Sequence, residues 1–324
     1  MKNKIFNVLI VGCGRIGAFF DKPKDRNVLT HAHAFSLHKG FNLVGFIDSD
    51  FEQAKKAASV WGGQVFKNID EAFKNNKIDI VCNAAPDKFH FQILKEILKY
   101  KPRLILAEKP LTATLKEAKK IMKLAKKNKI EMAVNYRRRF VPEFKKIKKD
   151  IKNGKYGEYL TGNGYYTKGI VHNGSHAIDL LLYFVGNIKK SFTLANNGGS
   201  VNDPQITTAI EFNNKKKFFL QNINHNLYTI FELDLLFSKA RIRIINSGFK
   251  IEIQKIKDDK IFKGYRNMEY DRIINTSLNK SLYFAADNIY KHLSGGEELD
   301  CSLKDEYQNM LAAHKIAHLN ERQA

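Results

Sequence analysis

Three glycines near the start of the chain are spaced for dinucleotide binding. Gly12, Gly14 and Gly17 fit the pattern G-x-G-x-x-G and directly follow the apolar run Phe6–Val11. In this setting Gly12 permits a tight turn, and Gly14 lets the backbone approach a pyrophosphate. Gly17 lets the following helix pack on the strand. The motif alone is common, but its place between a strand and a helix predicts a nucleotide-binding turn.

The next residues complete the cofactor prediction. Arg15 and Ile16 open the helix, whose free N–H groups and positive partial charge suit phosphates. Asp48 ends the next apolar run, where a carboxylate accepts hydrogen bonds from ribose hydroxyls and repels a 2′-phosphate. NAD is therefore favoured over NADP, while Lys55 and Lys56 keep NADP open. The alternative for Asp48 is a simple turn residue.

Apolar strands and amphipathic helices alternate through the first part of the chain. Such alternation predicts a doubly wound parallel sheet with helices on both faces, a Rossmann α/β domain that we assign to residues 1–127. An insertion, Asp21–Thr30, explains the long spacing between the glycines and Asp48. The expected strands are Phe6–Val11, Phe41–Ile47, Val65–Phe66, Ile78–Asn83, Arg103–Ala107 and Ile130–Val134.

Beyond about residue 155 short strands separated by turn residues dominate. They predict an α+β domain with a large, mostly antiparallel sheet, and we assign residues 128–324 to it. One face of such a sheet needs a cover, so we expect a homodimer or homotetramer. The expected helices of this domain are His176–Phe184, Ser281–His292 and Leu303–Leu319.

Four short motifs in a fixed order give the chain a family resemblance. They are Ala84-Ala85-Pro86 with His90, Glu108-Lys109-Pro110, Asn135–Phe140, and His172–Asp179. In this order and spacing the series resembles the Gfo/Idh/MocA oxidoreductases, which include glucose–fructose oxidoreductase and inositol dehydrogenase. The resemblance runs from residue 6 to about residue 190.

The resemblance implies which side chains handle the substrate proton. Lys109 corresponds to the family lysine at the reacting hydroxyl, and His176 to the histidine that exchanges the proton. Oxidation of an alcohol needs a base for the hydroxyl proton, and histidine titrates near neutrality. A lysine beside a cationic nicotinamide has a lowered pKa and can act on the same oxygen. The hypothesis requires Lys109 and His176 to meet at the nicotinamide end of the cofactor.

The same resemblance implies further cofactor contacts. They are the wall residues Ala85, Pro86 and His90, the nicotinamide-ribose contact Glu108, and the nicotinamide neighbours Lys109 and Asn135.

One position departs from the family pattern. His172 stands where the family usually has an aspartate, four residues before His176. An imidazole can relay a proton or contact an anionic substrate, but it supplies no fixed negative charge. We therefore expect His172 to assist in catalysis or substrate binding, with a space-filling role as the alternative. The intervening Asn-Gly-Ser argues against a helical metal-chelating pair, and no metal is expected.

Other polar residues are candidates for the substrate. Arg137 and Arg139 could hold a phosphate or carboxylate in fork geometry, with a solvated turn as the alternative. Tyr166 leads into the histidine motif and could line the same cleft.

The overall composition restricts the partners. The formal net charge is +22, but the lysines are spread along helix-like segments without the basic and aromatic rhythm of nucleic-acid modules. We therefore expect no nucleic acid, and the charge suits a phosphorylated or nucleotide-linked substrate. The 3 cysteines are isolated, no apolar run is long enough to cross a membrane, and no signal segment is recognised. A cytoplasmic location is expected.

Together these features predict an NAD(P)-dependent oxidoreductase. Its expected substrate is a ring hydroxyl or ketone of a sugar, sugar phosphate, nucleotide sugar or cyclitol. Two alternatives stay open: a sugar lyase or glycosidase that oxidises its substrate transiently, and a catalytically silent sensor of NAD or sugar.

Overall fold

The computed structural model describes residues 4–318 and divides into two compact units. Within the described residues, the first unit comprises 4–140 together with 279–307, and the second comprises 141–278 together with 308–318. The boundary lies after residue 140 rather than at the predicted 127/128. The reason is that the strand Glu131–Val134 pairs with the sheet of the first unit.

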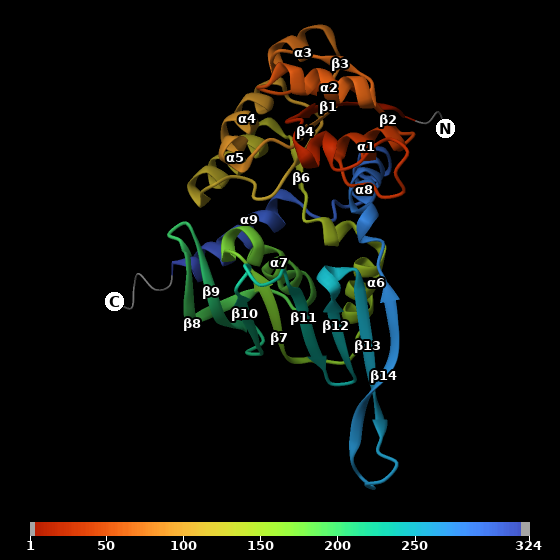
Figure 1. The fold of residues 1–324 in the computed structure, drawn as a ribbon, viewed down its shortest axis with the longest axis vertical. Helices are drawn as coiled ribbons and strands as arrows, with labels where there is room; N and C mark the ends of the chain where they lie inside the picture. Colours follow the sequence, from red (N-terminus) through yellow and green to blue (C-terminus); the bar gives the residue numbers. More distant parts are fainter. Residues whose placement is uncertain (1–3, 319–324) are drawn as a thin grey trace. The chain divides into compact units, whose positions relative to one another are not determined.

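The first unit contains a six-stranded, wholly parallel sheet in the order β3-β2-β1-β4-β5-β6 (Figure 1). This is the doubly wound order of a Rossmann fold, as predicted. Every residue of β4 and β5 is buried, as expected of strands covered on both faces. The strands are β1 (Phe6–Val11), β2 (Phe41–Ile47), β3 (Gln64–Val65), β4 (Ile80–Asn83), β5 (Leu104–Ala107) and β6 (Glu131–Val134).

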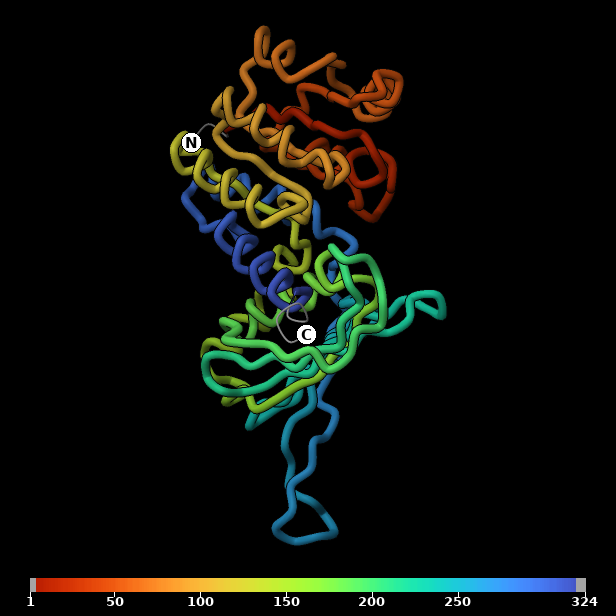
Figure 2. Tube along the Cα trace, turned by 90° about the vertical axis from the view of Figure 1, so that its left-hand side faces the viewer, coloured from red at the N-terminus to blue at the C-terminus, as the bar shows by residue number. Residues whose placement is uncertain are grey.

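Helices cover both faces of this sheet. In Figure 2, α4 and α5 lie side by side on one face. On the other face, α1 and α8 share a core cluster with β1 that includes Val8, Phe35 and Ile289. The helices are α1 (His31–Leu37), α2 (Phe51–Trp61), α3 (Ile69–Asn75), α4 (Asp87–Tyr100), α5 (Leu115–Asn128) and α8 (Ser281–Gly295). Placing α8 in the second domain was therefore wrong, because its apolar side complements the first core.

The helix predicted after the glycines is one turn long. It covers Arg15–Phe19, where Phe20 N–H donates to the Arg15 carbonyl at 2.9 Å. The chain then leaves the helix after Phe19, and α1 starts at His31 with Thr30 as its cap. The buried carboxylate of Asp21 holds this insertion by accepting from Leu29 N at 2.5 Å, and it lies 2.8 Å from His33 Nδ1. The insertion is thus packed into the domain.

The second unit contains an eight-stranded sheet in the order β14-β13-β12-β11-β7-β10-β9-β8. Only β7 and β10 pair in parallel, so the prediction of a mostly antiparallel sheet is confirmed. The strands are β7 (Tyr159–Thr167), β8 (Ile188–Ser200), β9 (Asp203–Phe212), β10 (Lys217–Ile223), β11 (Phe231–Phe237), β12 (Ala240–Ile245), β13 (Lys250–Asp258) and β14 (Arg266–Asn275).

Alternation of side chains gives this sheet two different faces. One row across the outer face contains Phe192, Phe219, Asp234, Arg243 and Glu252. Its charged part is paired, since Arg243 Nη1 lies 3.3 Å from Glu252 Oε1. Apolar side chains of the row are exposed at Phe192 and Phe219, and also at Ile273 of β14, which pairs with Glu252. The part of the sheet near β8 and β10 thus contains two exposed aromatic side chains in one row.

Two helices and a long hairpin complete the second unit. The rings of Phe144 and Phe184 stack between α6 (Pro142–Lys152) and α7 (Ser175–Phe184). The β13–β14 hairpin extends beyond the other strands of the sheet (Figure 1). The last helix is α9 (Leu303–Ala317). Its residues up to Tyr307 belong to the first unit, and those from Gln308 belong to the second. Among residues 4–318 no helix has the length and apolarity needed to cross a bilayer.

Candidate active site

The glycine turn at the end of β1 forms a cradle with strict spatial limits. Gly12 has φ +94°, and a Cβ there would lie 2.4 Å from the Ala85 nitrogen. A Cβ on Gly17 would lie 2.1 Å from the Gly12 carbonyl oxygen. Gly14 differs, because a Cβ there would meet nothing within 4 Å. Gly12 and Gly17 are thus required by packing, whereas Gly14 borders open space where a ligand would lie.

A cavity of about 580 Å³ adjoins this cradle. It is bounded by Gly12 and Gly14, by Asp48 at the end of β2, and by Ala85 and Pro86 after β4. These residues follow the carboxyl ends of neighbouring parallel strands, the position where doubly wound sheets bind nucleotides. The size of the cavity, the open space at Gly14 and the carboxylate of Asp48 therefore fit the nucleotide part of NAD.

Asp48 has two roles in this cavity. Its Oδ2 accepts a hydrogen bond from Cys13 N at 2.6 Å, which ties the glycine turn to β2. Its Oδ1 accepts from Asp50 N at 2.9 Å, and the residue is half-buried. Burial and the Asp48 carboxylate raise the pKa of the Cys13 thiol, so this thiol stays protonated. Asp48 therefore shapes the turn and also offers a carboxylate to the cavity.

Two buried amide atoms at the strand ends have no hydrogen-bond partner within residues 4–318. They are Nδ2 of Asn83, at the end of β4, and Oδ1 of Asn135, after β6. Buried polar atoms are normally paired, so such atoms call for an explanation such as a ligand. Asn135 is thus a candidate for a ligand contact through its Oδ1, while its Nδ2 donates to Glu108.

Glu108, which follows β5, is surrounded by polar and basic groups. Its Oε1 lies 2.7 Å from His31 Nε2 and accepts from Asn135 Nδ2 at 2.7 Å. Burial alone would raise its pKa, but His31, Asn135 and Lys109 together lower it. Burial also disfavours charged His31, yet Cys82 and Glu108 raise the pKa of His31 to about 10. Glu108 is thus a fixed anion among His31, Lys109 and Arg137.

The Lys109–Pro110 bond is cis, and Lys109 is half-buried next to this carboxylate. The two predicted arginines that follow β6 differ. Arg137 is half-buried, and burial lowers its pKa while the field of Glu108 acts in the opposite direction. Arg139 is buried, with Nη1 2.9 Å from Asp305 Oδ1. The charge of Arg139 thus holds the start of α9, so the structure favours Arg137 for a substrate anion.

His90 braces the site rather than lining the nucleotide cavity. Its ring lies on α4 and is buried, with Nε2 2.7 Å from the Ala85 carbonyl and Nδ1 2.7 Å from the Pro110 carbonyl. It therefore connects the loops after β4 and β5. The predicted cavity wall is formed by Ala85 and Pro86 alone of these three residues. Arg15 is exposed beside the turn, and Ile16 packs on the core.

In the second unit the histidine motif is anchored by a carboxylate from another strand. A single helical turn, Ile170–Gly174, carries His172 and leads into α7, where His176 is the second residue. Oδ1 of Asp203, at the start of β9, accepts from Val171 N at 2.7 Å and from His172 N at 3.1 Å. His172 is exposed and His176 is half-buried. Both imidazoles are thus accessible on this unit.

Tyr166 does not serve as predicted. Its side chain is buried, and its hydroxyl donates to the Ile206 carbonyl at 2.7 Å and accepts from Ile206 N at 3.1 Å. Burial raises its pKa. Because both hydrogen-bonding capacities are used within the sheet, Tyr166 connects β7 to β9 and is not placed to bind a substrate. Within residues 4–318, no group of three or more His, Cys, Asp or Glu side chains is arranged to hold a metal ion.

Several functional candidates escaped sequence reasoning. His31 is not among the site residues predicted above, Asn83 appears there only at the end of a strand, and Asp203 lies far from the motif it anchors. A polar residue ending a buried strand was a usable signal for Asn83. No local signal pairs Asp203 with a turn 32 residues earlier.

The fold and the cradle define a dinucleotide-binding domain. Residues 6–136 match the family described as "Oxidoreductase family, NAD-binding Rossmann fold", with the name GFO_IDH_MocA. The predicted resemblance to the Gfo/Idh/MocA oxidoreductases is therefore confirmed over the Rossmann part of the chain.

Curated relatives match over part of their length. An inositol 2-dehydrogenase of Corynebacterium glutamicum (strain R) is 29% identical over 198 residues, which cover 57% of this chain and 55% of the relative. The rhizopine catabolism protein MocA of Rhizobium meliloti is 27% identical over 207 residues, covering 59% and 60%. The aligned part thus spans little more than half of these relatives.

Solved structures match along the whole chain. The WlbA dehydrogenase from Bordetella pertussis, solved with NADH and UDP-GlcNAcA, has a TM-score of 0.79 at 16% identity, covering 100% of this chain and 98% of that one. A likeness at this identity establishes the two-part fold.

Proposed function

We propose that this chain is an NAD-dependent dehydrogenase that transfers a hydride between a nicotinamide ring and a ring hydroxyl or ketone of a sugar-type or cyclitol substrate. The observation that carries the proposal is the cradle at Gly14, which is open where a pyrophosphate would lie and adjoins the cavity bounded by Asp48. Relatives with the name inositol 2-dehydrogenase support a polyol substrate. When bound, the dinucleotide supplies the hydride acceptor or donor.

We assign the proton chemistry to Lys109 and His176, with His172 assisting. Lys109 follows β5 directly after Glu108, and its charge is one of the causes that lower the pKa of Glu108. His176 is the half-buried second residue of α7, and Asp203 fixes the turn before it. The fixed turn supports a proton-transfer role, which requires a held imidazole.

The finer substrate class rests on charge. Arg137 is half-buried near Glu108, and the whole chain has a formal net charge of +22. A guanidinium in such a setting supports an anionic substrate, because it attracts a phosphate or carboxylate group. We therefore propose sugar phosphates and nucleotide sugars ahead of uncharged sugars.

The activity test uses the purified chain with NAD⁺ or NADP⁺ and a panel of myo-inositol, free aldoses, aldose phosphates and UDP-linked sugars. Near-ultraviolet absorbance of reduced nicotinamide reports hydride transfer. We expect turnover with at least one panel member, and a drop in kcat of about 100-fold or more for Lys109→Met and for His176→Ala. NAD affinity of His176→Ala should remain unchanged.

Two outcomes would contradict the proposal. Product formation without accumulation of reduced nicotinamide would indicate the lyase or glycosidase alternative. Dinucleotide binding with no turnover of any panel member would favour a sensor. The variants His172→Ala and His172→Asp test the assisting role of His172. If only His176→Ala abolishes turnover, His172 does not assist.

A further inference from the structure

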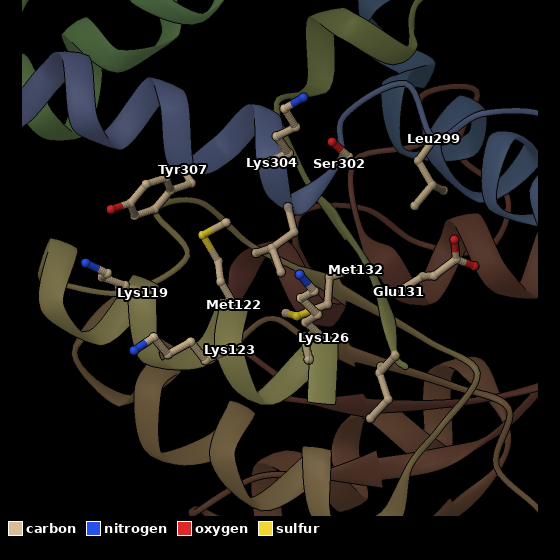
Figure 3. A pocket seen from close by; sticks show the side chains of 13 residues that line it. Lys119, Met122, Lys123, Lys126, Glu131, Met132, Leu299, Ser302, Lys304 and Tyr307 are labelled. Atoms are coloured by element: carbon tan, nitrogen blue, oxygen red, sulfur yellow. The ribbon is translucent and has the colours of Figure 1, made fainter. Parts of the chain in front are cut away.

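The first unit has a second cavity of about 520 Å³ that shares no residue with the nucleotide cavity. It lies between α5, the start of β6 and the segment 299–307, which includes the first turn of α9 (Figure 3). A cavity of this size can hold a small organic molecule. None of its lining residues belongs to the motifs considered above.

The position of this cavity follows from the edge of the sheet. β6 is the last strand, and only part of its open edge is covered. Ala133 bridges to Ser302, and Val134 N–H donates to the Cys301 carbonyl at 3.1 Å. The other end of the strand, at Ile130 and Met132, borders the cavity instead. The covering segment thus leaves a recess rather than closing over the whole strand.

The walls of the cavity are apolar. Met122 and Met132 lie near its centre in Figure 3. The other apolar or aromatic residues of the lining are Ala125, Ile130, Leu299, Leu303 and Tyr307. Methionine side chains are flexible and polarisable, so they adapt to apolar bodies of different shape. The walls therefore suit an aliphatic or aromatic group.

The rim is predominantly basic. Lys119, Lys123 and Lys126 project from successive turns of α5, and Lys304 comes from α9. All four are exposed, and within residues 4–318 none forms an ion pair. The lining contains one carboxylate, that of Glu131, which lies 2.7 Å from His292 Nε2. Four ammonium groups and a single carboxylate thus surround an apolar recess.

We propose that this cavity binds a small amphipathic organic anion. Its apolar body lies against Met122, Ile130 and Met132, and its anionic head group lies among the lysines of the rim. Burial of the apolar body contributes affinity that does not depend on precise geometry. The lysines select for a negatively charged head group. The proposal is independent of the dinucleotide site and of the proposed reaction.

The test uses two probes with the same tail and opposite head groups, decanoate and decyltrimethylammonium. Isothermal titration calorimetry is run below their micelle concentrations on the full chain with saturating NAD⁺. We expect decanoate to bind with 1:1 stoichiometry and decyltrimethylammonium not to bind. The variant Lys119→Glu/Lys126→Glu should weaken decanoate binding about tenfold or more, since it replaces two attractions by repulsions.

The matched control is Lys120→Glu/Lys127→Glu. These lysines have the same spacing on the same helix, and both are exposed, but neither lines the cavity. The control should bind decanoate within about twofold of the wild type, because exposed charges at this distance are screened. Met122→Gln, at a half-buried position, should also weaken binding.

Three results would overturn the proposal: equal weakening in both double variants, equal binding of the two probes, or no binding of decanoate. A fall in molar mass of Lys119→Glu/Lys126→Glu, with no effect on decanoate, would instead identify this surface as an interface between copies of the chain.

Discussion

Gly14 should matter for cofactor binding but not for the stability of the fold. A methyl group at this position would meet no protein atom within 4 Å, and φ is −74°. We therefore expect Gly14→Ala to keep the melting temperature within about 2 °C of the wild type. NAD affinity should fall about tenfold or more, because the methyl group occupies the space for the pyrophosphate. Differential scanning fluorimetry and NAD titration measure the two effects.

Gly17→Ala is the contrasting control. Its Cβ would lie 2.1 Å from the Gly12 carbonyl oxygen, so it should lower the melting temperature clearly. If Gly14→Ala bound NAD like the wild type, the cradle would not be the phosphate site.

Asp48 should control the choice between NAD and NADP. Asp48→Asn keeps an oxygen for the hydrogen bond from Cys13 N but removes the negative charge. We expect this variant to bind NADP about tenfold more tightly than the wild type, since repulsion of the 2′-phosphate is lost. Asp48→Ala should weaken both cofactors because the turn also loosens. Unchanged discrimination in Asp48→Asn would contradict a role of this charge, and titration with both cofactors measures it.

The His31–Glu108 pair predicts a particular pH dependence of stability. The pKa of His31 rises from 6.5 to about 10, so its stabilising contribution is complete below pH 6.5 and is lost as pH rises toward 10. The pKa of Glu108 is lowered from 4.5, so its contribution is present above pH 4.5 and is lost as pH falls through the lowered pKa.

We therefore expect the melting temperature of the wild type to fall between pH 6.5 and 10 more steeply than that of His31→Gln. The glutamine amide can donate to Glu108 but does not titrate. At pH 6.5, His31→Ala should cost about 3 kcal/mol or more, because it leaves a buried carboxylate without its partner. Parallel pH profiles of wild type and His31→Gln would contradict a charged pair.

The turn before α7 should hold the proposed catalytic histidines in place through Asp203. Asp203 accepts from two successive backbone N–H groups, and its position is fixed by β9. Asp203→Ala removes the oxygen that accepts both hydrogen bonds, so the turn that carries His172 and leads to His176 should become less fixed. We expect kcat to fall about tenfold or more while NAD affinity stays unchanged, because the cradle belongs to the other unit. Asp203→Asn, which retains an acceptor oxygen, should recover most of kcat.

Regular elements were predictable where the residue pattern alone determines them. The bounds of Phe6–Val11 and Phe41–Ile47 were predicted as the structure has them. A continuous apolar run bounded by turn residues forms a strand of a parallel sheet, because both faces of such a strand are buried. The insertion Asp21–Thr30 was predicted, but its packing against the domain was not. This packing depends on Asp21, whose carboxylate pairs with Thr30 and His33 only in the folded domain.

The two types of sheet were predictable from the sequence, but the return of the chain from the second unit to the first was not. Strand alternation indicated a parallel and a mostly antiparallel sheet. The return of 279–307 to the first unit rests on long-range apolar contacts such as that of Ile289 with the β1 cluster. For the same reason the site was predicted in part: motifs located Gly12, Asp48 and Glu108, whereas the buried roles of Arg139 and Tyr166 depend on distant partners.

The oligomeric state is the remaining prediction at the scale of the whole molecule. Phe192 and Phe219 are exposed to 44% and 40% and lie in one row of the outer face, on either side of Ala209. Exposed aromatic side chains on an open sheet face favour association. We expect light scattering to give a dimer or tetramer of the 37.2 kDa chain, and Phe192→Lys/Phe219→Lys to give the monomer. Ile261→Lys/Phe262→Lys, at an equally apolar hairpin tip, should leave the oligomer intact; dissociation by this control alone would place the interface at the hairpin.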